Sequence, residues 1–151
     1  MLRARSTGDV GSTAEAGERL EPGTVFIAPT DYHMEVTPSH RISLHQEPPE
    51  VNQRPAGNVL LRSIARIYGG RAVGVVLTGM GEDGARGLER LARVGARTIA
   101  QDEETSIVFG MPKVAIERGA AQEVLPSSVI AEAITRLVVE LQKQSPGDAG
   151  S

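Results

Sequence analysis

The second half of the chain alternates short apolar runs with longer stretches that carry apolar residues at helical spacing. The apolar runs are residues 72–77 (AVGVVL), 97–100 (RTIA) and 123–125 (EVL), and each has the length and composition of a buried strand. The helical stretches are residues 84–94, 112–118 and 129–141, the last preceded by Ser127 and Ser128 as candidate caps. This alternation predicts a parallel sheet covered by helices, and therefore an α/β fold.

The first half predicts smaller elements. Residues 24–28 (TVFIA) have the pattern of a short strand that ends at Pro29, and residues 34–36 and 41–44 predict a hairpin. Residues 59–68 predict a helix that ends at Gly69-Gly70. Asn58 directly precedes this stretch and has a side chain suited to cap it.

The chain is organised as one domain between two polar ends. Its 151 residues suit about one domain. Residues 1–16 are rich in Gly, Ser, Thr, Ala and Arg without periodicity, and residues 144–151 resemble them in composition. We expect both ends to be disordered, so that the domain spans residues 17–143.

The composition excludes several classes of protein. A net charge of −3 and a pI of about 5.6 argue against nucleic-acid binding, which needs a basic surface. No apolar run approaches the ~20 residues of a membrane span, and the N-terminus lacks the apolar core of a secretory signal. The absence of cysteine excludes disulfides and thiolate chemistry. The cytoplasm is therefore the expected compartment.

The loop within residues 75–88 (VVLTGMGEDGARGL) is the strongest candidate for chemistry, and it has two interpretations. In the first, its three glycines, at positions 79, 81 and 84, form a dinucleotide-binding turn, and Asp102 lies where a ribose-binding acid is expected. Against this, Glu82 and Asp83 bring two carboxylates to the place that a pyrophosphate would occupy, and like charges repel. The glycines then serve only a tight turn and close packing of a helix on the sheet.

In the second interpretation, Asp83 is a catalytic carboxylate. An aspartate just past a strand end, at a helix N-terminus, is held ionised by the helix dipole and the free N–H groups. Such a carboxylate suits the acid of a Ser-His-Asp arrangement, which holds the imidazole in one tautomer. Spacing alone favours a simpler role, because Asp is also a common helix-capping residue.

Two motifs and the segments around them resemble a known family. The motifs are TGMG-x-D-G at residues 78–84 and FGMPK at residues 109–113. Together with GERLEPGTVFIAPTDYHMEV (17–36), EPPEVNQRP (47–55) and the rest of residues 74–125, they resemble the catalytic domain of CheB-type chemotaxis methylesterases. The resemblance runs from about Gly17 to Leu137. It departs after the Arg-Pro pair, where the family commonly has a small hydroxyl and an acid and this chain has Ala56-Gly57-Asn58.

The resemblance implies a doubly wound, three-layer parallel sheet and hydrolysis of glutamate methyl esters on chemoreceptors, with possible deamidation of receptor glutamines. It implies that Asp83 is the triad acid. It also implies that Met80 lies beside the active site, where its backbone helps to hold the oxyanion. No metal or organic cofactor is needed for this chemistry. The expected partners are methylated chemoreceptors and, because no receiver domain precedes this part, a separate response regulator or N-terminal segment.

The family's nucleophilic serine and its histidine belong to a region before the part that begins here at Gly17, so the domain is expected to be incomplete. Ser6 lies in a Ser-Thr-Gly sequence that only superficially resembles the nucleophile turn. His33 matches a histidine outside the family's triad, and His40 and His45 have the positions of turn and strand-end residues. We therefore predict that this polypeptide alone is weak or inactive. The alternative is a non-catalytic module that binds receptors.

Overall fold

The computed structural model describes residues 3–4 and 12–144, and its second half is built on a parallel sheet. The sheet has the order β6 (Val73–Val76), β7 (Arg97–Gln101) and β8 (Glu123–Leu125), and both pairings are parallel. These strands form where the sequence has its continuous apolar runs, because a strand covered on both faces buries side chains of both orientations. The prediction of an α/β fold with a parallel sheet is confirmed.

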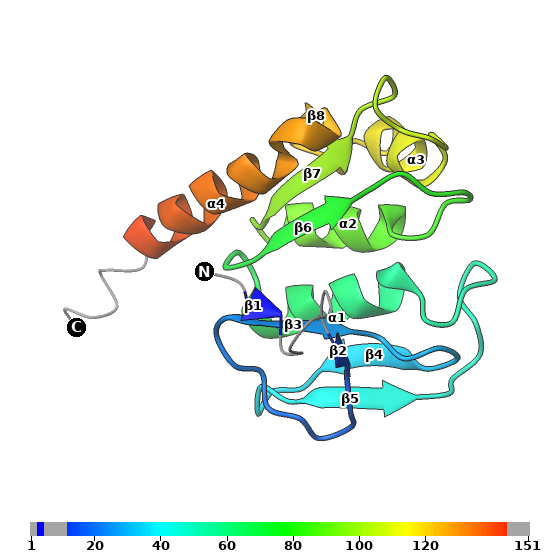
Figure 1. Ribbon diagram of the computed structural model, residues 1–151, viewed down its shortest axis with the longest axis vertical. Helices are drawn as coiled ribbons and strands as arrows, with labels where there is room; N and C mark the ends of the chain where they lie inside the picture. The colour runs from blue at the N-terminus through cyan, green and yellow to red at the C-terminus, as the bar shows by residue number, and fades with distance from the viewer. Residues whose placement is uncertain (1–2, 5–11, 145–151) are drawn as a thin grey trace.

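Helices cover both faces of this sheet (Figure 1). On one face, α2 (Ala85–Arg93) and α3 (Met111–Glu117) bury Leu88 and Ala115 against Val76. On the other face, α4 (Ser127–Gln144) places Ile130 and Leu137 against Ile99. The sheet is therefore the middle of three layers, as the sequence resemblance implies.

The first half forms a smaller unit beneath α1 (Gly57–Tyr68). It contains an antiparallel hairpin of β4 (His33–Val36) and β5 (Ile42–His45). A short parallel sheet has β3 (Thr24–Ile27) at its centre. One face of α1 packs on β4 and another on α2, so α1 connects the first half of the chain to the layer that covers the main sheet (Figure 1).

The ordered structure begins earlier than the predicted domain boundary at residue 17. Arg3–Ala4 form β1 and Ser12–Thr13 form β2, and both pair in parallel with β3. Ala14 is only 3% exposed, and its N–H donates to the Ile27 carbonyl. Residues 12–16, which were expected to be part of a disordered leader, therefore have defined structure, because their backbone groups complete the β3 sheet. Ser6 and residues 145–151 lie outside the described residues.

The remaining predicted elements agree closely with the structure. The hairpin, the helix that begins near Pro112 and the long C-terminal helix all form within three residues of their expected limits. Every helix in the described part of the chain is too short or too polar to cross a membrane.

Candidate active site

The loops that follow β6 and β7 interlock at the carboxyl end of the sheet. The Gly79 N–H donates to the Val108 carbonyl at 3.0 Å, and the Met111 N–H donates to the Gly79 carbonyl at 2.9 Å. The Thr78 hydroxyl accepts from the Val108 N–H at 2.9 Å, and the Thr78 N–H donates to the Gln101 side chain at 2.8 Å. The two sequence motifs therefore form one structural unit.

The glycines of this unit permit close contact. A Cβ atom on Gly110 would lie 2.7 Å from the Gly79 carbonyl oxygen and 3.0 Å from the Gly81 nitrogen. Gly84 has a φ of +90°, and a Cβ there would lie 3.2 Å from a methyl group of Val76. These positions need glycine for the shape of the turn and for helix–sheet packing.

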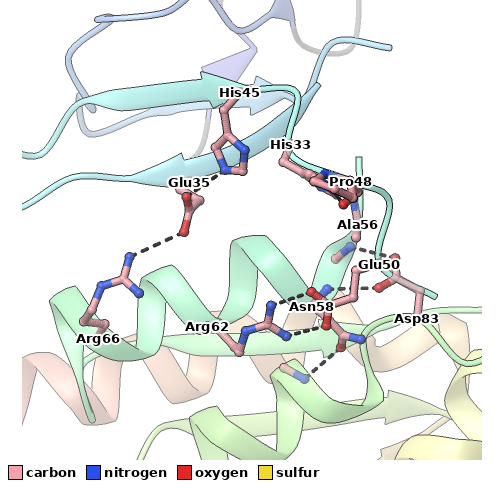
Figure 2. A network of polar contacts seen from close by, with 12 residues as sticks. His33, Glu35, His45, Pro48, Glu50, Ala56, Asn58, Arg62, Arg66 and Asp83 are labelled. Atoms are coloured by element: carbon pink, nitrogen blue, oxygen red, sulfur yellow. Dashed lines mark hydrogen bonds and ion pairs between the residues drawn. The ribbon is translucent and has the colours of Figure 1, made fainter. Parts of the chain in front are cut away.

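The half-buried carboxylate of Asp83 is held by the first turn of α1. The Gly57 N–H donates to Oδ2 at 2.6 Å, and the Asn58 N–H donates to Oδ1 at 3.0 Å (Figure 2). Two free amides and the positive end of the α1 dipole thus stabilise the ionised carboxylate. The expectation that α2 would supply these groups is wrong, because Asp83 precedes the left-handed Gly84 that caps α2 and its side chain reaches α1 instead.

Asn58 has a different role from the one its sequence position predicts. The helix begins at Gly57, with Ala56 as its N-cap residue, and Asn58 lies inside the first turn. The Asn58 Oδ1 accepts from the Gly87 N–H of α2 at 2.8 Å. The prediction that Asn58 caps its own helix is therefore wrong. The Asp83 carboxylate accepts from the first amides of α1, and the Asn58 side chain accepts from an amide of α2.

The three histidines of the chain all have partners other than Asp83. His33 is 1% exposed, accepts from the Ala56 N–H at Nδ1 and contacts the Pro48 carbonyl through Nε2. His45 binds Glu35 at 2.8 Å, and the exposed His40 binds the Tyr68 hydroxyl at 3.0 Å.

Two other sequence candidates also have clear positions. The Met80 side chain is 79% exposed at the tip of the loop, so it makes little packing contribution there. The Asp102 carboxylate accepts from the N–H and hydroxyl of Thr105, which closes the turn after β7. The hydrogen bonds of Asp102 thus stabilise a local turn, which gives this residue a structural role that needs no ribose.

A groove of about 400 Å³ runs beside the Asp83 loop. It is lined by Val51, Asn52, Gly81, Glu82 and Val114. One wall is a tight turn, in which the Glu50 and Gln53 backbones exchange two hydrogen bonds and Val51 and Asn52 have positive φ angles of 45° and 62°. A β-branched residue rarely adopts this conformation, and no motif in the sequence marks this turn as part of the site.

The groove wall is fixed to α1 by a side-chain ion pair. Both guanidinium NH groups of Arg62 donate to the Glu50 carboxylate (Figure 2). The hydrogen bond from Arg62 holds the pKa of Glu50 below its ordinary value, although desolvation of the carboxylate opposes this. Glu50 is therefore a charged anchor at neutral pH.

A second hollow, of about 600 Å³, lies near the start of β6 between α1 and α4. Its lining is mostly aliphatic and includes Val73, Ile134, Val138 and Leu141. It contains no carboxylate or histidine. We therefore place the candidate site at the carboxyl end of the sheet, as is usual in open α/β sheets.

The geometry defines an α/β protein with a fixed carboxylate at the carboxyl ends of parallel strands. Each Asp83 oxygen receives one amide hydrogen bond and retains acceptor capacity for another donor, such as an imidazole N–H. Among the described residues there is no group of three or more His, Asp or Glu side chains arranged to hold a metal ion.

Comparison with known proteins assigns the chain to a family. The model of the CheB methylesterase family matches residues 1–134, and the chain belongs to this family. The crystal structure of the Thermotoga maritima CheB methylesterase catalytic domain superposes with a TM-score of 0.81 at 40% identity. The match covers 85% of this chain and 69% of that domain.

Two full-length relatives agree with this assignment. A protein-glutamate methylesterase/protein-glutamine glutaminase of Symbiobacterium thermophilum is 50% identical over 127 residues, which cover 84% of this chain and 35% of the relative. The protein-glutamate methylesterase FrzG of Myxococcus xanthus is 48% identical over 125 residues, which cover 83% and 37%. The chain thus spans little more than a third of the length of these relatives.

Proposed function

We propose that this chain supplies the acid of a Ser-His-Asp site that hydrolyses glutamate methyl esters on chemoreceptors. The observation that carries the proposal is the fixed position of the Asp83 carboxylate, with amide hydrogen bonds of 2.6 Å and 3.0 Å from the first turn of α1. The names of the relatives, protein-glutamate methylesterases, support ester hydrolysis as the reaction. Methylated chemoreceptors are then the substrate and the partner.

In the proposed reaction, a serine hydroxyl attacks the ester carbonyl and passes its proton to a histidine. Asp83 holds that histidine in the correct tautomer and stabilises the imidazolium, while remaining ionised. The tetrahedral intermediate expels methoxide, which takes the proton and leaves as methanol. Water then repeats the attack with the same base, so the glutamate carboxylate and the serine hydroxyl are restored. The Met80 backbone N–H is the proposed donor to the oxyanion.

We propose that the histidine and the serine of this site come from outside the residues described here. His33, His40 and His45 bind Ala56, Tyr68 and Glu35, respectively. The proposed further partners are a separate N-terminal segment that supplies both groups, or a separate response regulator. The chain alone is then weak or inactive as an esterase, and it retains at most a capacity to bind receptors.

The test measures methanol release from receptor membranes that carry labelled methyl esters. The chain is assayed alone and together with a polypeptide that spans the part of a relative's catalytic domain that this chain does not match. We expect little release from the chain alone and restored release from the mixture. In the mixture, Asp83→Asn should lower kcat by about 10³- to 10⁴-fold, as expected when the triad base loses its correct tautomer.

Glu104→Gln is the matched control, because it removes an exposed carboxylate from the neighbouring loop after β7 that does not line the groove. Its rate should remain within about twofold of the parent rate, since an exposed charge contributes little. Equal rates for the Asp83→Asn mixture and the parent mixture would refute the assignment of Asp83. Receptor binding that is indifferent to Asp83→Asn, without hydrolysis in any mixture, would favour the non-catalytic module.

A further inference from the structure

Three consecutive backbone amides at the start of α1 are satisfied by only two side chains. The Ala56 N–H donates to His33 at 3.3 Å, and the next two N–H groups donate to the two oxygens of Asp83. Helix-starting amides lack partners within their own helix. Their direction therefore depends on these two side chains, which come from β4 and from the loop after β6.

The partners of His33 determine its tautomer. A carbonyl oxygen only accepts hydrogen bonds, so the contact of 3.0 Å with the Pro48 carbonyl requires a proton on Nε2. The Ala56 N–H only donates, so it requires a lone pair on Nδ1. These two contacts fit the Nε2–H tautomer of His33, and one ring links Pro48 to the N-cap residue of α1 (Figure 2).

The surroundings allow His33 little freedom to move. Its residue is 1% exposed and Ala56 is 2% exposed. The ring of His45 lies 5.4 Å away between centroids, but the His45 Nε2 binds Glu35 and makes no hydrogen bond to the start of α1. His33 is thus a rigid link between the hairpin and the turn that holds Asp83.

We propose that His33 is a positioning residue for Asp83: it sets the direction of the first α1 turn, and that turn orients the carboxylate. The proposal rests on the proposed function to the extent that Asp83 is the acid of the reaction. His33 has no contact with the reacting atoms in this account. It acts through Ala56, one residue before the Gly57 amide that binds Asp83.

The first experiment needs no enzyme activity. Amide hydrogen exchange of Gly57 and Asn58 is measured by NMR in the parent chain, in His33→Phe and in His33→Gln. The phenyl ring keeps an aromatic side chain but neither hydrogen bond, so exchange at both amides should accelerate by about fivefold, as expected for the loss of one hydrogen bond. Gln retains a donor and an acceptor and should recover part of the protection. His45→Gln, the matched control, should leave both amides unchanged.

The second experiment measures methyl ester hydrolysis in the mixture described above. His33→Phe should lower kcat about 10- to 100-fold without a change in KM, because a small displacement of a catalytic group slows chemistry more than binding. If His33→Phe does not fold, the imidazole ¹⁵N shifts of the parent chain decide the question. A population of the Nδ1–H tautomer would overturn the proposal.

The outcomes separate this inference from the proposed function. Unchanged exchange at Gly57 and Asn58 in folded His33→Phe would refute the positioning role. Faster exchange with an unaltered kcat would refute it for catalysis. Absence of hydrolysis in every mixture would refute the proposed function, while the exchange data would still show whether His33 holds the turn.

Discussion

Two regions border the first turn of α1, and they are held in different ways. The Asp83 loop is fixed by backbone groups, namely the α1 amides and the hydrogen bonds of Gly79 with Val108 and Met111. Residues 46–54, on the other side of the turn, are fixed mainly by long side chains. Arg62 binds Glu50, and Arg54 binds Asp31 at 2.7 Å and reaches the carbonyls of Gln46 and Glu47.

The difference separates a rigid region from an adjustable one. Backbone donors are part of the helix and the strand ends, so they lose little entropy when they bind a carboxylate. Arginine side chains lose rotamer freedom in every ion pair, and the exposed pairs are screened by salt. We infer that backbone hydrogen bonds fix the position of the Asp83 loop, whereas the position of the groove wall at residues 50–53 depends on side-chain ion pairs.

The largest expected effect breaks the contact between the two loops of the rigid region. Gly110→Ala would place its Cβ 2.7 Å from the Gly79 carbonyl and 3.0 Å from the Gly81 nitrogen. Both neighbours are backbone atoms, so relief requires a shift of the loop itself. We expect a loss of about 2–3 kcal/mol in the free energy of unfolding, within the range for overpacking, measured by urea denaturation.

Gly57→Ala is the control for this change. A Cβ on Gly57 would lie 3.4 Å from the nearest Asp83 oxygen, which is an ordinary contact. The same substitution should therefore change stability by no more than about 0.5 kcal/mol. Equal losses of unfolding free energy for the two variants would mean that the contact between the two loops is no more closely packed than the start of α1.

The elements of the rigid region were largely predictable from the sequence, because their causes are local. Continuous apolar runs specify strands that are buried on both faces, and residues 73–76 and 97–101 form where these runs occur. The position of Asp83 just past a strand end follows from the same pattern. The family resemblance added its role as an expectation, which the geometry of the site supports without a test of catalysis.

The partners of the candidate site were not predictable in the same way. A helix start needs external acceptors, but the sequence does not say which side chain will supply them. Asp83 lies 25 and 26 positions from the two amides it binds, and Asn58 serves Gly87 rather than its own helix. These assignments depend on how α1 packs on α2, which is a tertiary property.

The next prediction tests the side-chain hydrogen bonds that link the starts of α1 and α2. Asn58→Ala removes the acceptor of the Gly87 N–H while the Asn58 N–H, which binds Asp83, is kept. We expect a loss of about 1–2 kcal/mol, typical of a lost cap, and faster exchange of the Gly87 amide hydrogen. Gln53→Ala removes an exposed amide side chain from the adjustable region and should cost less than about 0.5 kcal/mol. Fast hydrogen exchange of the Gly87 amide in the parent chain would contradict its hydrogen bond to Asn58.

The smallest expected effect concerns the ion pair between Glu50 and Arg62. Its dependence on pH tests whether charge holds the groove wall, in contrast to the Asp83 loop. The hydrogen bond from Arg62 holds the pKa of folded Glu50 below its ordinary value of 4.5. The folded state therefore favours the ionised carboxylate, so this stabilisation is complete above the unfolded pKa and is lost as the pH falls through the folded one. The side chains of Arg62 and Glu50 are 42% and 28% exposed, so solvent screening limits the contribution to roughly 0.5 kcal/mol.

Unfolding free energies at pH 7 and pH 3 should differ less in Glu50→Gln than in the parent chain. Added salt should reduce the same difference, because it screens the pair. An identical pH dependence in the parent chain and Glu50→Gln would show that the groove wall is held by packing and backbone hydrogen bonds, and the contrast with the Asp83 loop would then disappear.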